Sequence, residues 1–132
     1  MHAVRLFGDP RALRDDALRN GLKVFDGVTL TSSTPIATIV GDMTRYTGKL
    51  VQIEGYVTET CQVAGCWAKL IDKASGKTMS LKVTDGAYDF RTDIKVGNYA
   101  VGDGTVATAD PGAVIWIDGY GAMISSIVCP MP

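Results

Sequence analysis

Leu50-Val51-Gln52-Ile53-Glu54-Gly55-Tyr56-Val57-Thr58 is the clearest sign of the fold, because apolar residues recur in it at every second position. Successive side chains of a β-strand point to opposite faces, so Val51, Ile53 and Val57 share one face and the polar residues between them share the other. The pattern predicts a strand with one face in a core and the other in water.

Further strands follow at 66–71 and 78–83, on either side of the turn sequence Ala74-Ser75-Gly76-Lys77. A turn at 62–65 predicts three facing pairs, which are Val57 with Leu70, Glu59 with Ala68, and Cys61 with Cys66. After a less regular crossover, residues 98–107 and 114–128 complete five strands. Gly102-Asp103-Gly104 and Asp118-Gly119-Tyr120-Gly121 are interpreted as turns and not as phosphate loops, since neither opens a helix.

Five strands in this order, with 15 glycines in 132 residues, are typical of a mainly β protein, because bends and tight turns recruit glycine. We expect a five-stranded OB-type Greek-key barrel with one or two short N-terminal helices. A small β-sandwich is the alternative. With 46% hydrophobic residues, the chain is large enough to bury the core of a single domain.

Two helices are expected before the barrel. Residues 10–20 begin at a proline and end at the stop signal Asn20-Gly21. Most of their surface is charged, so we expect a loosely packed helix, with a partner-binding helix as the alternative. Residues 22–33 indicate a turn or short edge strand. Thr34 as cap and Pro35 at the first position predict an amphipathic helix over 34–46 that covers a barrel end. We therefore assign residues 1–24 to an N-terminal extension and 25–132 to the barrel domain.

The hairpin Thr60-Cys61-Gln62-Val63-Ala64-Gly65-Cys66-Trp67 is the most chemically distinctive segment. Two thiols across a tight turn suit a disulfide or a shared metal ion. A closed zinc site takes four ligands, and only Cys129 and His2 are available beyond the pair. Cu(I) accepts thiolates and thioethers and needs fewer ligands, which Cys129, Met131 or Met79 would supply. Buried, inert cysteines are the structural alternative, and a redox pair that cycles between dithiol and disulfide is a third option. The possible cofactors are therefore Cu(I), Zn or none.

Val51-Gln52-Ile53-Glu54-Gly55-Tyr56-Val57 followed by Cys61 and Gly65-Cys66-Trp67 resembles an uncharacterised bacterial OB-fold domain family. Its members share a V-x-V-x-G-x-V strand and a C-x-x-x-G-C-W turn. The resemblance covers about residues 25 to 128 and implies an OB fold with no settled activity. Members often look exported, whereas this N-terminus has no apolar stretch of the secretory type. Both an exported and a cytoplasmic location therefore stay open.

A candidate ligand face lies opposite the core side of the strands. Trp67, Lys69, Ser80 and Lys82 point there, with Tyr56 beside them. OB domains stack bases or sugars on aromatic residues and meet phosphates with lysine. The net charge of −1 gives no overall attraction to nucleic acid.

Catalytic residues are scarce, because the single histidine is His2, close to the terminus. We therefore expect a non-catalytic OB-fold binding module for a small ligand or a protein. An oligonucleotide-binding domain and an assembly subunit are the alternatives. We expect a soluble protein, since no run of the chain has the roughly 20 apolar residues of a membrane span.

Overall fold

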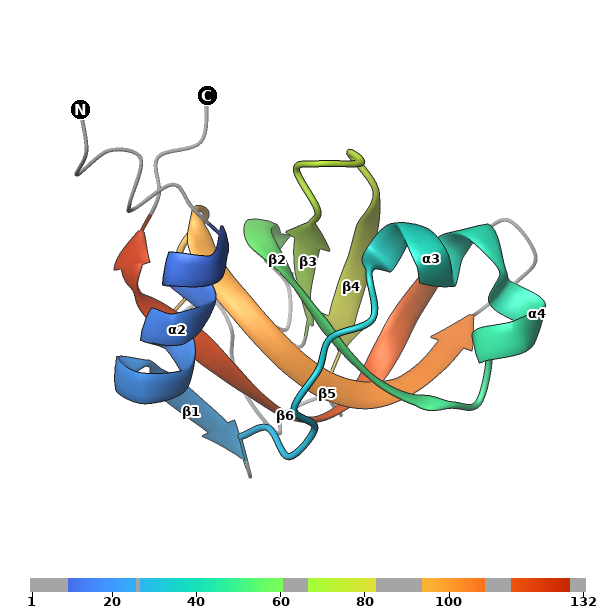
Figure 1. Cartoon of the computed structure of the whole chain (residues 1–132), viewed down its shortest axis with the longest axis horizontal. Coiled ribbons are helices and arrows are strands. Elements are labelled where there is room, and N and C mark those ends of the chain that lie inside the picture. The colour runs from blue at the N-terminus through green and yellow to red at the C-terminus, as the bar shows by residue number, and fades with distance from the viewer. Residues whose placement is uncertain (1–9, 26, 61–66, 83–93, 109–114, 129–132) are drawn as a thin grey trace.

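The computed structural model describes residues 10–25, 27–60, 67–82, 94–108 and 115–128. Their elements, in chain order, are α2 (Pro10–Asn20), β1 (Leu22–Phe25), α3 (Ile36–Gly41), α4 (Met43–Tyr46), β2 (Leu50–Thr60), β3 (Trp67–Ile71), β4 (Thr78–Lys82), β5 (Asn98–Thr108) and β6 (Ile115–Val128). Strongly bent strands curl around one another, with α2 on one side and α3 and α4 at the opposite end (Figure 1).

Five of the strands form a closed ring. β2, β3 and β4 are an antiparallel meander, and β4 then pairs in parallel with β6. β6 pairs antiparallel with β5, and β5 pairs antiparallel with β2, which closes the ring. Closure with this connectivity is the Greek-key arrangement of an OB barrel. The predicted OB-type fold is confirmed, and the sandwich alternative is set aside.

β1 adds a sixth strand outside the ring. Its residues pair antiparallel with β6, with Leu22 opposite Ile124 and Val24 opposite Ala122. The earlier part of β6 uses the same edge to pair with β4. The short edge strand expected within residues 22–33 is therefore present.

The interior of the barrel is filled by the inward side chains of the strands and by the first residues of α3. This main core comprises Val24, Ile36, Ile39, Val51, Ile53, Val57, Ala68, Leu70, Met79, Leu81, Ile94, Ala100, Val106, Ala122 and Ile124. The predicted inward residues of β2, which are Val51, Ile53 and Val57, are among them. Period-two patterning thus identified the core face correctly.

The single helix expected over 34–46 is wrong, because the chain forms two short helices there. Asp42 separates α3 from α4 with φ −149° and ψ 65°, outside the helical region. Gly41-Asp42 has low helix propensity, so the break falls where the helix is weakest. The backbone N–H of Thr34 bonds Gln52 O at 2.8 Å, and no side chain caps α3. The two pieces still cover the barrel end, since Ile36 and Ile39 are buried.

The loose packing expected for the first helix is also wrong. Leu13 and Ala17 of α2 have no exposed surface. They form a second, smaller core with Tyr56, Tyr99 and Val101 on the outside of the barrel wall. The apolar stripe of Leu13 and Ala17 is narrow, but it is enough to hold α2 because the end of the helix lies very close to β6. A Cβ on Gly21 would lie 2.2 Å from Ile124 O. The boundary predicted between residues 24 and 25 falls within β1.

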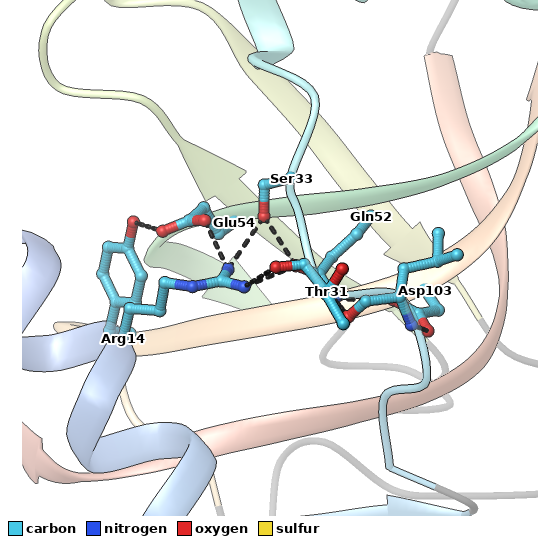
Figure 2. Close-up of polar contacts among 8 residues, drawn as sticks. Arg14, Thr31, Ser33, Gln52, Glu54 and Asp103 are labelled. Atoms are coloured by element: carbon cyan, nitrogen blue, oxygen red, sulfur yellow. Dashed lines mark hydrogen bonds and ion pairs between the residues drawn. The ribbon is translucent and has the colours of Figure 1, made fainter.

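The outward face of β2 is not in water, contrary to the prediction. Gln52 is 0% and Tyr56 2% exposed. The helix α2 and the segment 27–34 lie over this face, and Figure 2 shows their side chains meeting those of β2. Alternation of polar and apolar residues reports which side chains face the barrel interior, but it cannot report what covers the outside.

The hairpin register is partly as predicted. Val57 lies opposite Leu70, but a β-bulge after Val57 places Glu59 opposite Lys69, so the expected pairing of Glu59 with Ala68 is wrong. An extra residue on one strand shifts all later partners by one, and here Thr58 Oγ1 donates to Lys69 O at 3.3 Å. The predicted facing of Cys61 and Cys66 lies outside the described residues.

The two glycine-flanked acidic motifs are not turns. Asp103 lies within β5 and Asp118 lies within β6.

In the described part of the chain, no helix is long and apolar enough to span a membrane.

Candidate functional site

Arg14 is the centre of a polar network between α2 and the outward face of β2. Its Nη1 donates to Glu54 Oε1 at 2.6 Å and to Ser33 Oγ at 3.0 Å. Its Nη2 donates to Gln52 Oε1 at 2.9 Å and to Thr31 O at 3.4 Å. Figure 2 shows the guanidinium between these acceptors. A planar group with fixed donors suits this position, because it bonds several acceptors at once.

Asp103 anchors the other end of the network. Its Oδ2 accepts hydrogen bonds from the backbone N–H groups of Thr29 and Leu30, at 2.6 and 3.0 Å. Its Oδ1 accepts from Gln52 Nε2 at 3.0 Å, and the same amide nitrogen donates to Leu30 O at 2.7 Å. At 2% exposure, this carboxylate is buried and fully engaged. It therefore fixes the segment leading to Ser33 against β2 and β5.

Glu54 joins the network to an aromatic pair. Its second oxygen, Oε2, accepts a 2.6 Å hydrogen bond from the Tyr99 hydroxyl. The Tyr99 ring meets the Tyr56 ring edge to face, with centroids 5.1 Å apart. Burial, followed by the hydrogen bond to Glu54 and its negative charge, raises the pKa of Tyr99 well above its usual range. The phenol is therefore held protonated as a donor.

The turn between β3 and β4 places Lys73 beside the Tyr56 ring. Asp72 shapes this turn by accepting hydrogen bonds from the Ala74 N–H and the Ser75 hydroxyl, both at 3.0 Å. The Lys73 ammonium then lies 4.3 Å from the centroid of the Tyr56 ring, a cation–π distance. The positive charge of Lys73 and the ring of Tyr56 are therefore in contact, and both line the same cleft as Glu54.

These groups border a cleft of about 300 Å³. It lies between the start of α2, the start of α3, the outward face of β2 and the β3–β4 turn. Its lining residues are Pro10, Ser33, Thr34, Pro35, Ile36, Glu54, Gly55, Tyr56, Ile71, Asp72, Lys73, Ala74 and Tyr99. Prolines and aliphatic groups make most of the walls, and the polar atoms of Glu54 and Tyr99 converge at one side.

The ligand face predicted from the sequence is only partly assembled. Trp67 lies opposite Lys82 on adjacent strands, with Lys69 two positions along β3. All three are partly exposed, but Trp67 packs against the main core and Lys69 pairs with Glu59 at 2.8 Å. Tyr56 does not belong to this exposed face, because α2 and its loop bury it. It lines the cleft instead.

The predicted metal ligands Cys61, Cys66, Cys129 and Met131 lie outside the described residues. Met79, the remaining candidate, is 1% exposed and packs in the main core. Within the ranges that the structure covers, no cluster of three or more histidine, cysteine or acidic side chains is placed to hold a metal ion. The hairpin site therefore stays a prediction.

Sequence reasoning missed most of the cleft and its supporting network. Their residues come from three elements and one turn, which hold Arg14 (α2), Glu54 (β2), Tyr99 and Asp103 (β5), and Lys73 (the β3–β4 turn). One signal was present: a carboxylate within the apolar strand sequence of β5 needs partners when buried. Interpreting Gly102-Asp103-Gly104 as a turn concealed that signal.

Comparison with solved structures supports the OB fold. The chain is similar to OBody AM3L15 bound to hen egg-white lysozyme, with TM-score 0.62 and 18% identity, over 80% of this chain and 98% of that one. OBody AM1L10, bound to the same lysozyme, gives TM-score 0.57 and 18% identity over 74% and 97%. A putative aspartyl-tRNA synthetase from Leishmania major Friedlin gives 0.58 and 14%, over 83% of this chain and 25% of that enzyme. No protein-family model and no curated protein matches the chain.

Proposed function

We propose that the protein is a non-catalytic OB-fold binding module whose ligand occupies the cleft beside Glu54 and Tyr99. The observation that carries this proposal is the cleft itself, in which apolar walls surround a few converging polar groups. Ligand sites in proteins have this composition, and about 300 Å³ is the lower end of their usual size. The ligand is therefore a small molecule or a single side chain of a protein.

The network behind the cleft supports the proposal because it fixes the polar groups before any ligand arrives. Arg14 and Tyr99 each bond one oxygen of Glu54. Asp103 and Gln52 hold the segment that carries Ser33. Groups that are already ordered lose less conformational entropy on binding, which raises affinity.

The same contacts favour recognition over catalysis. An acid–base catalyst must exchange a proton with its substrate, and its pKa is tuned toward the working pH. Tyr99 is shifted in the opposite direction, toward permanent protonation. Glu54 accepts hydrogen bonds at both oxygens from protein groups. In this proposal, the pair orients a ligand and transfers no proton to it.

Screening a fragment library by NMR on isotope-labelled protein tests the proposed function. We expect the fragments that bind to shift the amide signals of Gly55, Lys73 and Tyr99 together, since these residues come from three sides of the cleft. Bound fragments that instead shift only residues elsewhere, or the absence of any bound fragment, would overturn the proposal.

A second candidate function is oligonucleotide binding at Trp67. It is favoured by the facing of Trp67 and Lys82 across β3 and β4, since stacking and phosphate contact would then occur side by side. Binding of a single-stranded oligonucleotide would weaken with salt and be lost in Trp67→Ala. Binding that ignores both changes would eliminate this candidate.

A further inference from the structure

The position of Lys73 indicates the charge of the ligand that suits the cleft. The side chain as a whole is exposed, yet its ammonium stands 4.3 Å from the centroid of the buried Tyr56 ring. A long lysine side chain on an exposed turn has many other positions, and ordering it there costs entropy. The aromatic face is therefore an attractive position for a positive charge.

The surrounding groups reinforce that attraction. The carboxylate of Glu54, paired with Arg14, lies at the side of the cleft, and Tyr99 is held neutral. Asp72 lies at the turn beside Lys73. Aromatic faces carry the negative part of a quadrupole. The Arg14 guanidinium, which would attract an anion, already makes four hydrogen bonds in the network. The lining thus suits a cation better than an anion.

We propose that the cleft recognises an alkylammonium group and that Lys73 occupies the position of this group as a tethered competitor when no ligand is bound. This inference rests on the proposed function, because it names the ligand class of the same cleft. A ligand amine displaces the Lys73 ammonium into water and takes its place over Tyr56, between Glu54 and Asp72. The apolar walls formed by Pro35, Ile36 and Ile71 contact the alkyl chain.

If Lys73 is an internal competitor, removing its ammonium group should raise the affinity for the ligand by a predictable factor. An internal competitor lowers the apparent affinity by the fraction of time that it occupies the site. From the usual strength of an exposed cation–π contact, Lys73→Met is expected to bind alkylammonium about two- to fivefold more tightly than the unchanged protein. Lys77→Met is the matched control, because Lys77 lies on the same turn but does not line the cleft.

The probes are butylammonium and butan-1-ol, which have a similar shape but differ in charge. Each probe is titrated into the unchanged protein and both variants, and binding is followed by NMR. We expect butylammonium to shift the Gly55 and Tyr99 amide signals, and butan-1-ol to shift them far less. Of the two variants, only Lys73→Met should bind butylammonium more tightly than the unchanged protein. Diaminobutane and a lysine residue blocked at both ends then distinguish a free amine from a peptide side chain as the source.

Equal binding of butan-1-ol and butylammonium at the cleft would overturn the inference while leaving the proposed binding function intact. Unchanged affinity in Lys73→Met would overturn the role of Lys73 as competitor. Failure of butylammonium to bind, together with cleft binding by neutral or anionic fragments, would overturn the ligand class alone. Failure of every fragment would count against the proposed function itself.

Discussion

Arg14 of α2 and Glu54 of β2 form a 2.6 Å ion pair across 40 positions of the chain. Their side chains are 21% and 22% exposed, so the pair is largely shielded from water. Shielding makes each charge depend on the other, because an unpaired charge in such a place is costly. The helix before the barrel is therefore fastened to the wall of the cleft by charge as well as by the small core around Leu13 and Ala17.

Replacing Arg14 with methionine should lower the free energy of unfolding by about 2–3 kcal/mol. The substitution keeps the apolar stem but leaves Glu54, Ser33 and Gln52 short of donors, and charged hydrogen bonds are the stronger ones. Chemical denaturation followed by circular dichroism measures the change. Arg19→Met on the same helix is the control. Arg19 pairs with Asp15, but both side chains are more than half exposed, so the change should be within about 0.5 kcal/mol. Equal losses in the two variants would contradict a special role for the Arg14 network.

Stability should fall as the pH rises through the alkaline range, because of Tyr99. Burial and the hydrogen bond to Glu54 raise its pKa above the ordinary 10.0. Above pH 10, the unfolded chain therefore loses this proton while the folded chain keeps it, and proton loss favours unfolding. Below that pH, the contribution of the group is fully present. Tyr99→Phe has no such proton, so the stability difference between the two proteins should shrink above pH 10. A difference that stays constant with pH would contradict the assigned environment.

Gly55→Ala should destabilise the protein by about 1–3 kcal/mol, the usual cost of overpacking. A Cβ at Gly55 would lie 2.5 Å from Ile71 O, so β2 and β3 would have to separate. Thermal unfolding compares it with Gly41→Ala, whose added Cβ has no neighbour within 4 Å. We expect the second variant to differ little from the unchanged protein. A stable Gly55→Ala protein would show that the strands are less tightly apposed than the structure has them.

The cysteine hairpin is open to a direct chemical test. The leading hypothesis from the sequence is that Cys61 and Cys66 form either a disulfide or part of a soft-metal site, with buried, inert thiols as the alternative. Protein purified without reducing agent should therefore show a mass deficit of two hydrogens or bound copper or zinc, by intact mass and metal analysis before and after alkylation. Three free thiols in metal-free protein would contradict both forms of this hypothesis.

The barrel was largely predictable from sequence because strands repeat every second residue. Val51, Ile53 and Val57 mark one face of β2 without reference to anything distant. The bulge after Val57 was not predictable, since one extra residue leaves the alternation on either side intact. Its effect appears only in the partner strand, where Glu59 meets Lys69.

The cleft was hidden from sequence reasoning for a different reason. Gln52 and Glu54 are polar, and polar residues in a strand with alternating character are most often in water. Here Arg14 and the segment ending at Ser33 cover them through contacts that span 19 to 40 positions. Such pairings depend on where α2 docks, and a charged helix surface gives little sign of that. The Lys73 contact likewise depends on strand pairing, because Ile71 at the end of β3 lies opposite Tyr56 and the turn that carries Lys73 follows it.

Blocking the cleft beside Glu54 and Tyr99 tests whether it is the ligand site. Ala74 is exposed and lines the cleft, whereas Lys77 is exposed on the same turn outside the lining. Ala74→Trp places an indole at the cleft, and Lys77→Trp adds the same indole nearby. We measure the affinity of each protein for a bound fragment. We expect loss of binding in Ala74→Trp and unchanged binding in Lys77→Trp. Retained binding in Ala74→Trp would show that the ligand binds outside this cleft.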